Sequence, residues 1–434
     1  MSNSLSIIIL AAGKGTRMNS ATPKVLHKIA NREIIMHIVD TCTKIKPENI
    51  YIVLGKNSDE IKKLLPKQVK IIIQNQQFGT AHALLCAKKK LEKVKGNLLV
   101  LYGDVPFLEL KTLKQLIKKN DNINMLGFET LSPKGYGRIK FKKTKVLQVI
   151  EDKNLKDEDK KIKICYSGIF SGNNKKIFDL LSKVKKNKNK KEFLLTDIFG
   201  IANSQNLQIS LFLAPEKEVM GINNLYQLSK AEEYFQSKLR KKFLLKGVYL
   251  LDPKSTYFSY DTNISSNVKI GSNNYFGKEV IIKNGVSIEA NNNIENTIIN
   301  QGAIIGPFSR LRNGTVIGAR SKIGNFVEIK NSKIGANTKI NHLSYIGDAN
   351  VGSDTNIGAG TITCNYDGKQ KHKTTIGNKV FIGSNCALIA PIKIGNESFV
   401  AAGSTISYNL KNRDFSIARA KQKIIKEGSK KFLK

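Results

Sequence analysis

The chain has 434 residues, a length that suggests two to three domains, and hydrophobic residues make up 41% of it, enough to build buried cores. Its formal net charge is +38, but lysine is spread along the whole chain, whereas nucleic-acid-binding proteins cluster basic residues beside aromatic ones and use arginine freely. We therefore expect no nucleic-acid partner, although the charge would concentrate anionic small molecules near the protein.

The chain has no features of a membrane or secreted protein. No apolar run approaches the roughly 20 residues that a membrane-spanning helix needs, so we expect no membrane insertion. The apolar start lacks the basic leader and the cleavage site of a secretion signal. The five cysteines are an odd number at wide spacings, which favours neither a disulfide framework nor a metal site. Together these features predict a cytoplasmic protein.

Short apolar runs alternate with helical patterns in the first half of the chain. A helical pattern covers Gly79–Leu91, between two of the apolar runs. This alternation predicts an α/β domain with a mostly parallel sheet, which we assign to residues 1–225. The candidate strands are Ser6–Leu10, Ile50–Leu54, Val69–Ile73, Leu98–Leu101 and Asn124–Gly127.

The second half has a different pattern. Residues 226–246 are typical of one long helix, which we interpret as a linker. From about Val268 an aliphatic residue followed by glycine returns at a hexapeptide spacing, which is typical of a parallel β-helix whose coils stack to bury one aliphatic side chain per strand. We assign residues 247–434 to this domain. The polar stretch Thr361–Thr374 interrupts the repeat, is too long for a corner, and suits a binding site.

The first candidate strand runs directly into the glycine-rich turn "AAGKG". Ligands of α/β sheets bind at the carboxyl ends of strands, and small residues there leave backbone N–H groups free to approach a phosphate. Arg17 and Lys24 supply cations. The turn does not match a Walker loop, nor a dinucleotide-binding motif, because Met18 stands at the position of the last glycine. Alone, the turn is equally compatible with a simple strand-to-helix connection.

Two further residues, Asp104 and His342, are candidates for metal binding and for catalysis. Asp104 follows another apolar run in "LLVLYGDVP", where an acid beside a phosphate loop could hold Mg²⁺, although a helix N-cap is the alternative. His342 lies among the repeats, at a position where a corner residue is usually Gly, Asn or Ser. Imidazole is a common general base, but a single histidine is also common as an ordinary polar residue.

The combination of motifs resembles the bacterial GlmU family. The resemblance extends from about Leu5 to Arg419, and its most specific motif is the last one. It implies a Rossmann-like nucleotidyltransferase domain, a linker helix and a left-handed parallel β-helix. The motifs are "LAAGKGTRM", "PKVLH", "QFGTAHA", "YGDVP", "GYGRI" and "GINN", then "GNFVEIK", "HLSYIGDA" and "NIGAGTITCNYDGKQKHKT".

The function that the resemblance implies is that of a bifunctional enzyme of UDP-N-acetylglucosamine biosynthesis, which supplies cell-wall and lipopolysaccharide precursors. Such an enzyme acetylates glucosamine-1-phosphate with acetyl-CoA. It then transfers UMP from UTP to N-acetylglucosamine-1-phosphate and releases pyrophosphate. The resemblance also implies a homotrimer, with the acetyltransferase site between subunits.

The resemblance further implies the residues of a Mg²⁺-dependent uridylyltransferase site. Arg17 and Lys24 would meet the phosphates as catalytic residues, and Asp104 with Asn223 would bind Mg²⁺. The remaining contacts to the nucleotide and the sugar would come from Leu10, Ala11, Ala12, Gly13, Gln74, Gly79, Thr80, Tyr102, Gly103, Gly137 and Glu151.

For the acetyltransferase site, the resemblance implies that His342 is the general base that accepts a proton from the glucosamine amine. Asn365 and Tyr366, in the polar interruption, would complete the pocket for the sugar and the acetyl group. The sugar phosphate would be held by Arg312, Lys330, Tyr345 and Asn356. Acetyl-CoA would contact Ala359, Ser384, Ala402 and Arg419.

Two departures from the family pattern concern the sugar contacts. Tyr166 stands where the family usually has an asparagine that touches the sugar, and Phe193 and Leu194 replace a tyrosine pair. Two alternatives to the bifunctional enzyme stay open. One is a monofunctional sugar-1-phosphate nucleotidyltransferase whose β-helix only trimerises or regulates, and the other is an inactive scaffold or nucleic-acid-binding protein.

Overall fold

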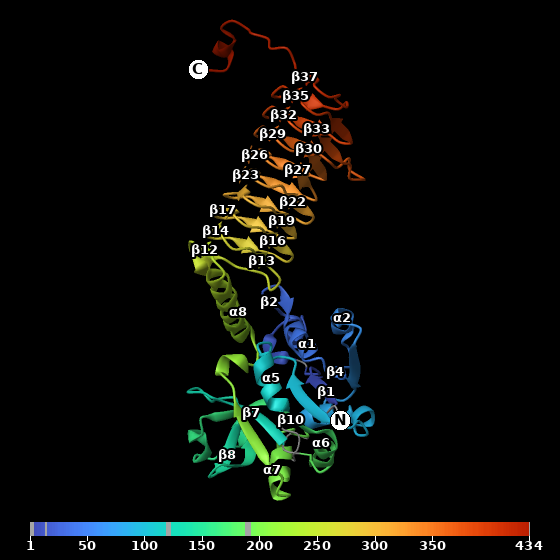
Figure 1. Cartoon of the computed structure of the whole chain (residues 1–434), viewed down its shortest axis with the longest axis vertical. Coiled ribbons are helices and arrows are strands. Elements are labelled where there is room, and N and C mark those ends of the chain that lie inside the picture. The colour runs from blue at the N-terminus through green and yellow to red at the C-terminus, as the bar shows by residue number, and fades with distance from the viewer. Residues whose placement is uncertain (1–3, 14, 119–122, 187–191, 434) are drawn as a thin grey trace. The chain divides into compact units, whose positions relative to one another are not determined.

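The structure is a computed structural model that describes residues 4–13, 15–118, 123–186 and 192–433. It divides into two compact units, Met1–Tyr234 and Phe235–Lys434. The boundary falls within helix α8 (Leu225–Leu245), so the expected helix over 226–246 is present (Figure 1). The assignment of 1–225, 226–246 and 247–434 to separate domains stays a prediction.

The first unit is built on a mixed sheet with the strand order β11-β7-β10-β6-β1-β4-β5. Neighbouring strands are parallel except β10, which runs antiparallel to both β6 and β7. The predicted strands are therefore confirmed as members of a mostly parallel sheet. The strands are β1 (Leu5–Leu10), β4 (Asn49–Gly55), β5 (Val69–Gln74), β6 (Asn97–Tyr102), β7 (Ile123–Glu129), β10 (Ile164–Asn173) and β11 (Ile209–Leu213), with the hairpin β8 (Arg138–Lys142) and β9 (Lys145–Ile150) beside β10 and the short pair β2 (Lys28–Ile29) and β3 (Arg32–Glu33) apart from it.

Helices cover both faces of this sheet, which explains why β1 is apolar throughout. Ile8 and Leu10 pack into one hydrophobic core and Ile7 and Ile9 into the other, all of them buried. The helices are α1 (Ile34–Ile45), α2 (Asp59–Leu64), α3 (Thr80–Leu85), α4 (Lys88–Leu91), α5 (Leu110–Ile117), α6 (Asn174–Leu181) and α7 (Asp197–Ser204).

One helix expectation needs correction. The pattern over Gly79–Leu91 is not one helix but the two short helices α3 and α4. The amide of Ala87 donates to the carbonyl of Leu84, three residues back, so the chain tightens into a turn between them. Apolar spacing persists through such a turn, which is why the pattern alone does not reveal the break.

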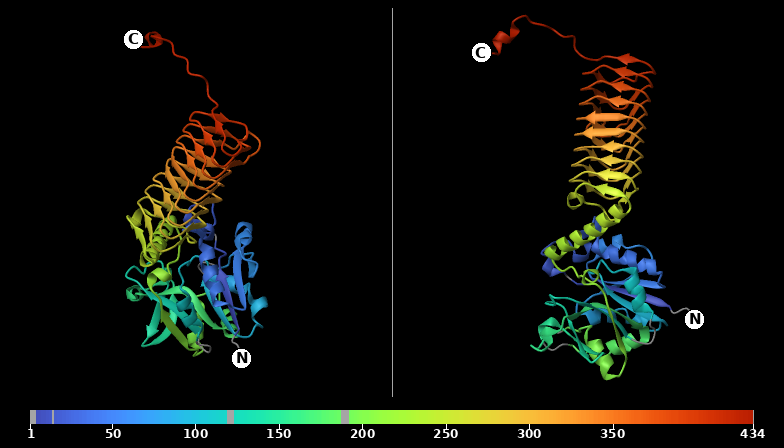
Figure 2. Two further views of the ribbon diagram at one scale, coloured as in Figure 1. Left: turned by 45° about the horizontal axis from the view of Figure 1, so that its top comes forward. Right: turned by 60° about the vertical axis from the view of Figure 1, so that its left-hand side comes forward.

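The second unit is a β-helix of three parallel sheets, and its strands stack coil upon coil (Figure 2). Each coil visits the three sheets in turn, and we name them the first, second and third faces. This arrangement confirms the β-helix predicted from the hexapeptide spacing.

The first face contains β12 (Val248–Leu250), β14 (Val268–Ile270), β17 (Ser287–Ile288), β20 (Ile304–Ile305), β23 (Lys322–Asn325), β26 (Lys339–His342), β29 (Asn356–Ile357), β32 (Phe381–Ile382), β35 (Phe399–Val400) and β37 (Phe415–Ser416). The second face contains β15 (Tyr275–Phe276), β18 (Asn293–Ile294), β21 (Arg310–Leu311), β24 (Glu328–Lys330), β27 (Tyr345–Gly347), β30 (Ile362–Cys364), β33 (Ala387–Ile389) and β36 (Thr405–Ile406). The third face contains β13 (Asn263–Ile264), β16 (Val280–Ile282), β19 (Thr297–Ile299), β22 (Thr315–Ile317), β25 (Lys333–Ile334), β28 (Ala349–Val351), β31 (Thr374–Ile376) and β34 (Ile392–Ile394).

The register between coils aligns the inward aliphatic side chains in columns. On the first face, Ile305, Ile323 and Ile340 are consecutive partners, and each is fully buried. The outward column of the same strands contains the charged residues Lys322 and Lys339 next to the exposed Ile304. The alternation in each short strand therefore separates the core from the surface, as strand geometry requires.

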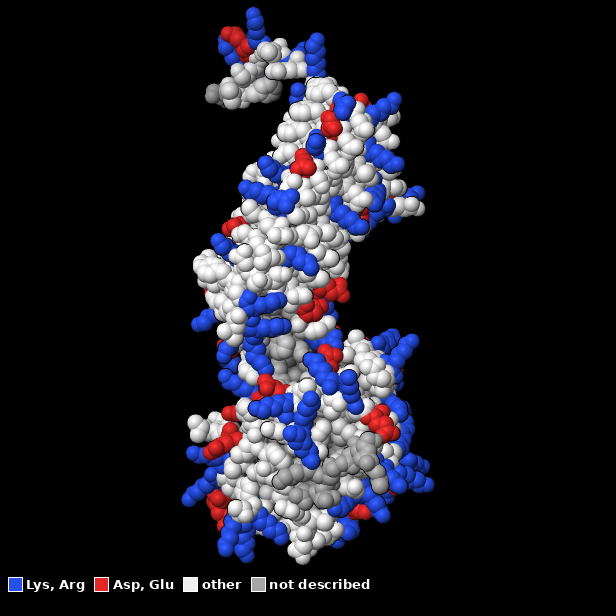
Figure 3. Space-filling view, viewed as in Figure 1, with Lys and Arg blue, Asp and Glu red and all other residues white. Residues whose placement is uncertain are grey.

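Positive charge is not confined to one part of the surface. Lys and Arg side chains are distributed over the visible face of both units, with Asp and Glu among them (Figure 3). Within the described ranges, no helix combines the length and the apolarity needed to span a membrane.

A buried asparagine ladder supports the first coils of the β-helix. The Asn292 amide nitrogen Nδ2 donates to Asn274 Oδ1 (3.0 Å) and to the carbonyl of Glu289 (2.8 Å), and its Oδ1 accepts from the amide of Ser309 (2.8 Å). Asn292 is almost fully buried. Its side chain therefore satisfies backbone groups that water cannot reach.

We predict that Asn292→Ala lowers the free energy of unfolding by about 1–3 kcal/mol, because it leaves buried donors and acceptors without partners. Urea unfolding followed by far-UV circular dichroism measures the change. The matched control is Asn284→Ala, since the exposed Asn284 side chain donates only to the carbonyl of Ser266. Equal effects of the two substitutions would contradict the ladder's role.

Candidate functional site

A cavity of about 640 Å³ lies where the central parallel strands of the first unit end. Leu10, Gln74 and Tyr102, the last residues of β1, β5 and β6, all line it. Of the residues that the resemblance implied for the first site, only Gly103, Gly137 and Glu151 do not line this cavity. The lining consists of Leu10, Ala11, Ala12, Gly13, Gly15, Thr16, Arg17, Lys24, Val25, Gln74, Gln77, Gly79, Thr80, Ala83, Tyr102, Asp104, Glu192, Leu194 and Asn223.

The glycine-rich turn after β1 presents its backbone to the cavity. The amide of Gly103 donates to the carbonyl of Leu10 (2.9 Å), and Gln77 Nε2 donates to the carbonyl of Ala12, so the turn is held from both sides. Gly15 has a φ of 65°, and a Cβ there would lie 2.7 Å from Lys24 Cβ. Glycine at this position therefore lets Lys24 reach the cavity. Lys14, in the same turn, lies outside the described residues.

Cations and oxygen donors meet on one side of the cavity. Lys24 Nζ forms an ion pair with Asp104 Oδ2 and also donates to Asn223 Oδ1 (3.3 Å). Arg17 Nη2 donates to the same Asn223 oxygen (2.8 Å). The amide of Asn223 donates in turn to Gln227 Oε1 (2.7 Å), which fixes the loop. The resemblance predicted every residue of this cluster except Gln227. The sequence indicated only that Gln227 belongs to a helix, and not that it contacts the site.

The donor set of this cluster fits a magnesium ion. Mg²⁺ prefers oxygen ligands and is commonly held by one or two carboxylates together with substrate phosphates. The oxygens of Asp104 and Asn223 converge on one cation, the Lys24 ammonium. In the part of the chain that the structure describes, no group of three or more His, Cys, Asp or Glu residues could hold a metal. A metal at Asp104 and Asn223 would therefore depend on phosphate ligands as well.

The opposite side of the cavity contains Gln74 and Thr80. Gln74 is buried, and its Nε2 donates to the carbonyl of Gly79 (3.2 Å) and lies 3.0 Å from His82 Nδ1. Thr80 Oγ1 accepts from the amide of Leu195 (3.1 Å). The segment that begins at Glu192 thus closes this side. Glu192 and Gln77 are polar lining residues that sequence reasoning missed, because they lie in loops without a periodic pattern.

Gly137 and Glu151 lie next to each other at the end of the β8–β9 hairpin, as the pairing of Arg138 with Ile150 requires. Glu151 Oε1 accepts from Thr196 Oγ1 (2.8 Å), in the segment that carries the lining residue Leu194. Glu151 is therefore connected to the wall of the cavity through that segment, and neither Gly137 nor Glu151 lines the cavity directly.

The hydroxyl of Tyr102 lies in the wall of the cavity, shares a hydrogen bond with Thr80 and has a raised pKa. Burial is the main cause that raises the pKa of Tyr102. The hydrogen bond with Thr80 opposes this shift in pKa, and the negative charges of Glu151 and Asp104 add to it. A neutral phenol in the wall of the cavity suits a polar, uncharged part of a ligand.

The two departures from the family pattern have different surroundings. Leu194 lines the cavity and gives it an apolar patch, whereas Phe193 is held by backbone bonds to Phe78 and Ala81. Tyr166 is only 6% exposed, packs edge-on against Phe199 at 5.1 Å, and has no hydrogen-bond partner for its hydroxyl among the described residues. The Tyr166 ring therefore belongs to the core.

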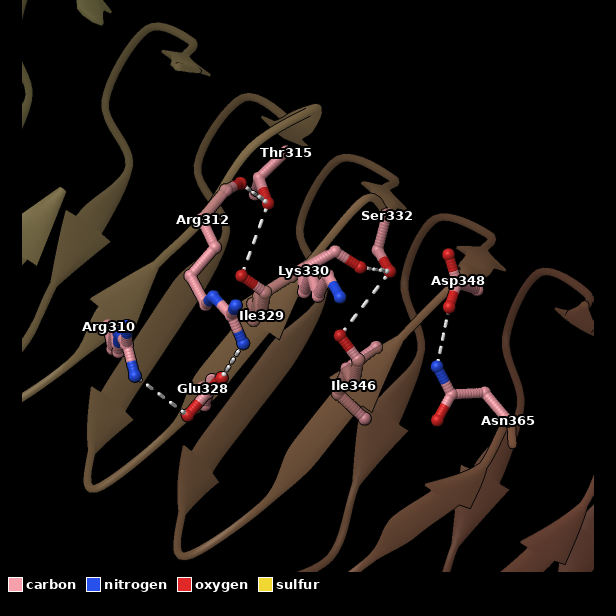
Figure 4. Close-up of polar contacts among 10 residues, drawn as sticks. All are labelled: Arg310, Arg312, Thr315, Glu328, Ile329, Lys330, Ser332, Ile346, Asp348 and Asn365. Carbon is pink, nitrogen blue, oxygen red and sulfur yellow. Dashed lines mark hydrogen bonds and ion pairs between the residues drawn. The ribbon is translucent and has the colours of Figure 1, made fainter. Parts of the chain in front are cut away.

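A second cluster of functional side chains lies on the second face of the β-helix. Arg312 and Lys330 follow each other on consecutive coils, and Arg312 Nη1 donates to Glu328 Oε1 at 2.7 Å (Figure 4). Proximity to the Lys371 side chain is the main cause that lowers the pKa of Lys330, and Arg312 adds to it. Lys371, on the polar interruption, is a cation that sequence reasoning missed. The three cations favour an anionic ligand such as a phosphate.

Gly347 leaves the space in which two other candidates meet. A Cβ on Gly347 would collide with the hydroxyl of Tyr345 and would lie 2.8 Å from Asn365 Nδ2. Asn365 Nδ2 donates to Asp348 Oδ2 (2.5 Å; Figure 4). The exposed Tyr366 donates its hydroxyl to the carbonyl of Gly368 (2.7 Å). Tyr345, Asn365 and the cations thus share one edge of the second face.

His342 lies at the corner between the first and second faces and is exposed. Its Nδ1 is 2.6 Å from Oδ1 of Asn325, its partner on the preceding coil. The register places the implied acetyl-CoA contacts Ala359, Ser384 and Ala402 in the same column on later coils, and Arg419 Nη1 donates to the carbonyl of Ala402 (2.8 Å).

Asn356, which the resemblance also implied for the second site, does not lie with the residues that would hold the sugar phosphate. It lies on the outward column of the first face, between Lys339 and Phe381. Within one chain, the structure therefore does not bring Asn356 together with Arg312 and Lys330.

Asp348 anchors the polar interruption to the β-helix. Its Oδ1 accepts from Asn331 Nδ2 (2.6 Å), and its Oδ2 accepts from Asn365. Asp354 occupies the next corner of the same coil, between the third and first faces, also with a positive φ, and accepts from Asn337 Nδ2 (2.9 Å) without contacting the interruption.

We predict that Asp348→Ala speeds limited tryptic cleavage at Lys369, Lys371 and Lys373, because Asn365 loses its anchor. Mass spectrometry of the early fragments measures the cleavage sites and rates. Asp354→Ala is the matched control and should leave these rates unchanged. Equal rates in the Asp348 variant and the unmodified protein would contradict the anchoring role.

Comparison with known proteins agrees with this two-part organisation. Residues 7–127 match the MobA-like NTP transferase domain family, and residues 296–331 and 373–407 match the bacterial transferase hexapeptide (six repeats) family. Proteins named "Bifunctional protein GlmU" are similar over nearly the whole chain. The one from Bartonella bacilliformis is 42% identical over 98% of this chain and 96% of its own length. Those from Zymomonas mobilis and Thermosipho africanus are 42% and 40% identical, each over 98% of this chain and over 97% and 96% of their own lengths.

Proposed function

This chain belongs to the GlmU family of bifunctional proteins, and from that premise we propose that its two units catalyse successive steps of UDP-N-acetylglucosamine synthesis. The β-helix acetylates glucosamine-1-phosphate with acetyl-CoA. The first unit transfers UMP from UTP to N-acetylglucosamine-1-phosphate and releases pyrophosphate. The main support is that each unit carries its own cluster of cations and polar groups, one in a cavity and one along a β-helix face.

The uridylyl transfer is a direct displacement at phosphorus. A phosphate oxygen of the sugar phosphate attacks the α-phosphorus of UTP, a new P–O bond forms, and the bond to pyrophosphate breaks. The backbone of Leu10–Gly13 would bind phosphate oxygens, and Arg17 and Lys24 would neutralise their charge. Positioning and charge neutralisation supply the rate enhancement, so no covalent enzyme intermediate is needed.

Asp104 and Asn223 would hold Mg²⁺ at this site. When bound, Mg²⁺ neutralises charge on the phosphates and on the leaving pyrophosphate. Lys24 then no longer has to compensate the Asp104 carboxylate, and its ammonium can contact a phosphate. The shared contacts of Lys24 with Asp104 and Asn223 support this exchange of partners.

In the acetyl transfer, the amine nitrogen of glucosamine-1-phosphate attacks the thioester carbonyl of acetyl-CoA. The C–N bond forms, the C–S bond breaks, His342 accepts the amine proton, and the CoA thiolate is protonated as it leaves. Arg312, Lys330 and Lys371 would hold the sugar phosphate, and Tyr345, Asn365 and Tyr366 would contact the sugar. The column of Ala359, Ser384, Ala402 and Arg419 would bind acetyl-CoA beside His342.

We further propose a cytoplasmic homotrimer. Its support is the position of Asn356, which lies on the first face while Arg312 and Lys330 lie on the second. In a trimer, Asn356 of one copy would complete the acetyltransferase site of its neighbour.

We predict that Asp104→Asn lowers the rate of pyrophosphate release by at least about 100-fold. The substitution removes the negative charge with which Asp104 would bind Mg²⁺, and Mg²⁺ would stabilise the transition state. Pyrophosphate production from UTP, Mg²⁺ and N-acetylglucosamine-1-phosphate measures this rate. Acetyl transfer by the same variant should be unchanged. Asp40→Asn, which removes the partner of Arg32 outside the cavity, is the matched control. Unchanged pyrophosphate release in the Asp104 variant would reject the assigned role.

We predict the opposite selectivity for His342→Gln. Loss of the general base should lower CoA release by about 10²- to 10⁴-fold, as is typical for acid–base groups, while uridylyl transfer remains within twofold. Free CoA from acetyl-CoA and glucosamine-1-phosphate is measured as a thiol. Loss of both activities in this variant would argue against two independent sites.

A further inference from the structure

We propose that Asn325 is a positioning residue for acetyl transfer: its side-chain oxygen fixes the ring orientation and the tautomer of His342, so that Nε2 is the nitrogen that accepts the amine proton. The inference rests on the proposed role of His342 as the general base. It adds a residue that makes no contact with the reacting atoms itself.

The register of the β-helix brings the two side chains together. Asn325 and His342 end the strands β23 and β26 and are direct partners on consecutive coils. Side chains at partnered positions point in the same direction, and here Oδ1 of Asn325 lies 2.6 Å from Nδ1 of His342. This distance is that of a strong hydrogen bond.

The backbone on both sides of this contact is fixed independently. The carbonyl of Asn325 accepts from the amide of Leu343 (3.1 Å), and the carbonyl of His342 accepts from Ser344 Oγ (2.8 Å). The Asn325 side chain is therefore not needed to connect the two coils. Its oxygen contacts the imidazole ring, and His342 is otherwise exposed.

The chemistry of the contact decides which ring nitrogen is the base. An amide oxygen only accepts hydrogen bonds, so the nitrogen that faces it must carry the proton. A neutral imidazole has a single N–H, and with that proton on Nδ1 the lone pair is on Nε2. Nδ1 is the ring nitrogen that contacts the preceding coil, which leaves Nε2 as the nitrogen for the substrate, and Ala359 and Ser384 follow His342 in the same column on later coils.

The test compares acetyl transfer by the full-length protein and by two variants at this position. Asn325→Ala removes the acceptor, and kcat should fall by about 10- to 100-fold, less than the roughly 10⁴-fold loss that a wrong histidine tautomer causes in serine proteases. KM for glucosamine-1-phosphate and for acetyl-CoA should stay within twofold, because Asn325 would touch neither substrate. Asn325→Asp keeps an acceptor and should restore most of kcat.

Three controls separate positioning from structural damage. Asn284→Ala removes an exposed asparagine side chain that also bonds to a neighbouring coil, and it should leave kcat unchanged. Uridylyl transfer and the melting temperature should be unchanged in both Asn325 variants. Imidazole ¹⁵N spectra of histidine-labelled protein, with the His342 signal assigned through His342→Gln, should show Nδ1–H in the unmodified chain and gain the Nε2–H form in Asn325→Ala.

The outcomes distinguish this inference from the proposed function. Unchanged kcat in Asn325→Ala, equal losses in the Ala and Asp variants, or an Nε2–H tautomer in the unmodified chain would each overturn the positioning role. Full acetyl transfer by His342→Gln would instead reject His342 as the base, and with it the proposed acetyltransferase mechanism.

Discussion

The coil-to-coil register of the β-helix is the constraint on which the second site depends. Buried isoleucines such as Ile323 and Ile340 stack in one column because any slip by one residue would expose them to water. The same register fixes the outward groups, since they alternate with the core residues along each short strand. Packing of the core therefore places His342 above Asn325, and no separate interaction is needed to bring them together.

A related constraint shapes the first site, although its residues come from distant segments. Parallel strands end at one edge of the sheet, so Leu10, Gln74 and Tyr102 reach the same cavity from three separate strands. Helices cover both faces of the sheet, so the edge at which the strands end is the part where a ligand can bind. Lys24 and Asp104 form an ion pair in this cavity, so the structure holds two opposite charges side by side there.

The sequence allowed us to predict features that repeat along the chain or that directly follow a strand. The hexapeptide spacing predicted the β-helix because each coil buries its aliphatic side chains in the same way. The turn after β1 indicated a ligand site only in combination with the other motifs. The sequence did not indicate three other residues of the sites, because loops bring them there through tertiary packing. These residues are Gln77, Glu192 and Lys371. The sequence also did not predict the pairing of Asn325 with His342. The coil from Ile323 to Ile340 is one residue shorter than the coil before it, so a strict repeat would assign His342 a different partner from Asn325.

At Tyr166, packing in the core compensates for a missing hydrogen bond. The Tyr166 hydroxyl is buried without a hydrogen-bond partner among the described residues, a situation that typically costs about 1–3 kcal/mol. The edge-on contact with Phe199 and the surrounding apolar core offset this cost by packing. Charged groups have no comparable substitute, since only a cation can neutralise a phosphate. Arg17, Lys24 and Asp104 are held by direct ionic and hydrogen-bonded contacts, whereas Leu194 adds an apolar side chain to the wall of the same cavity.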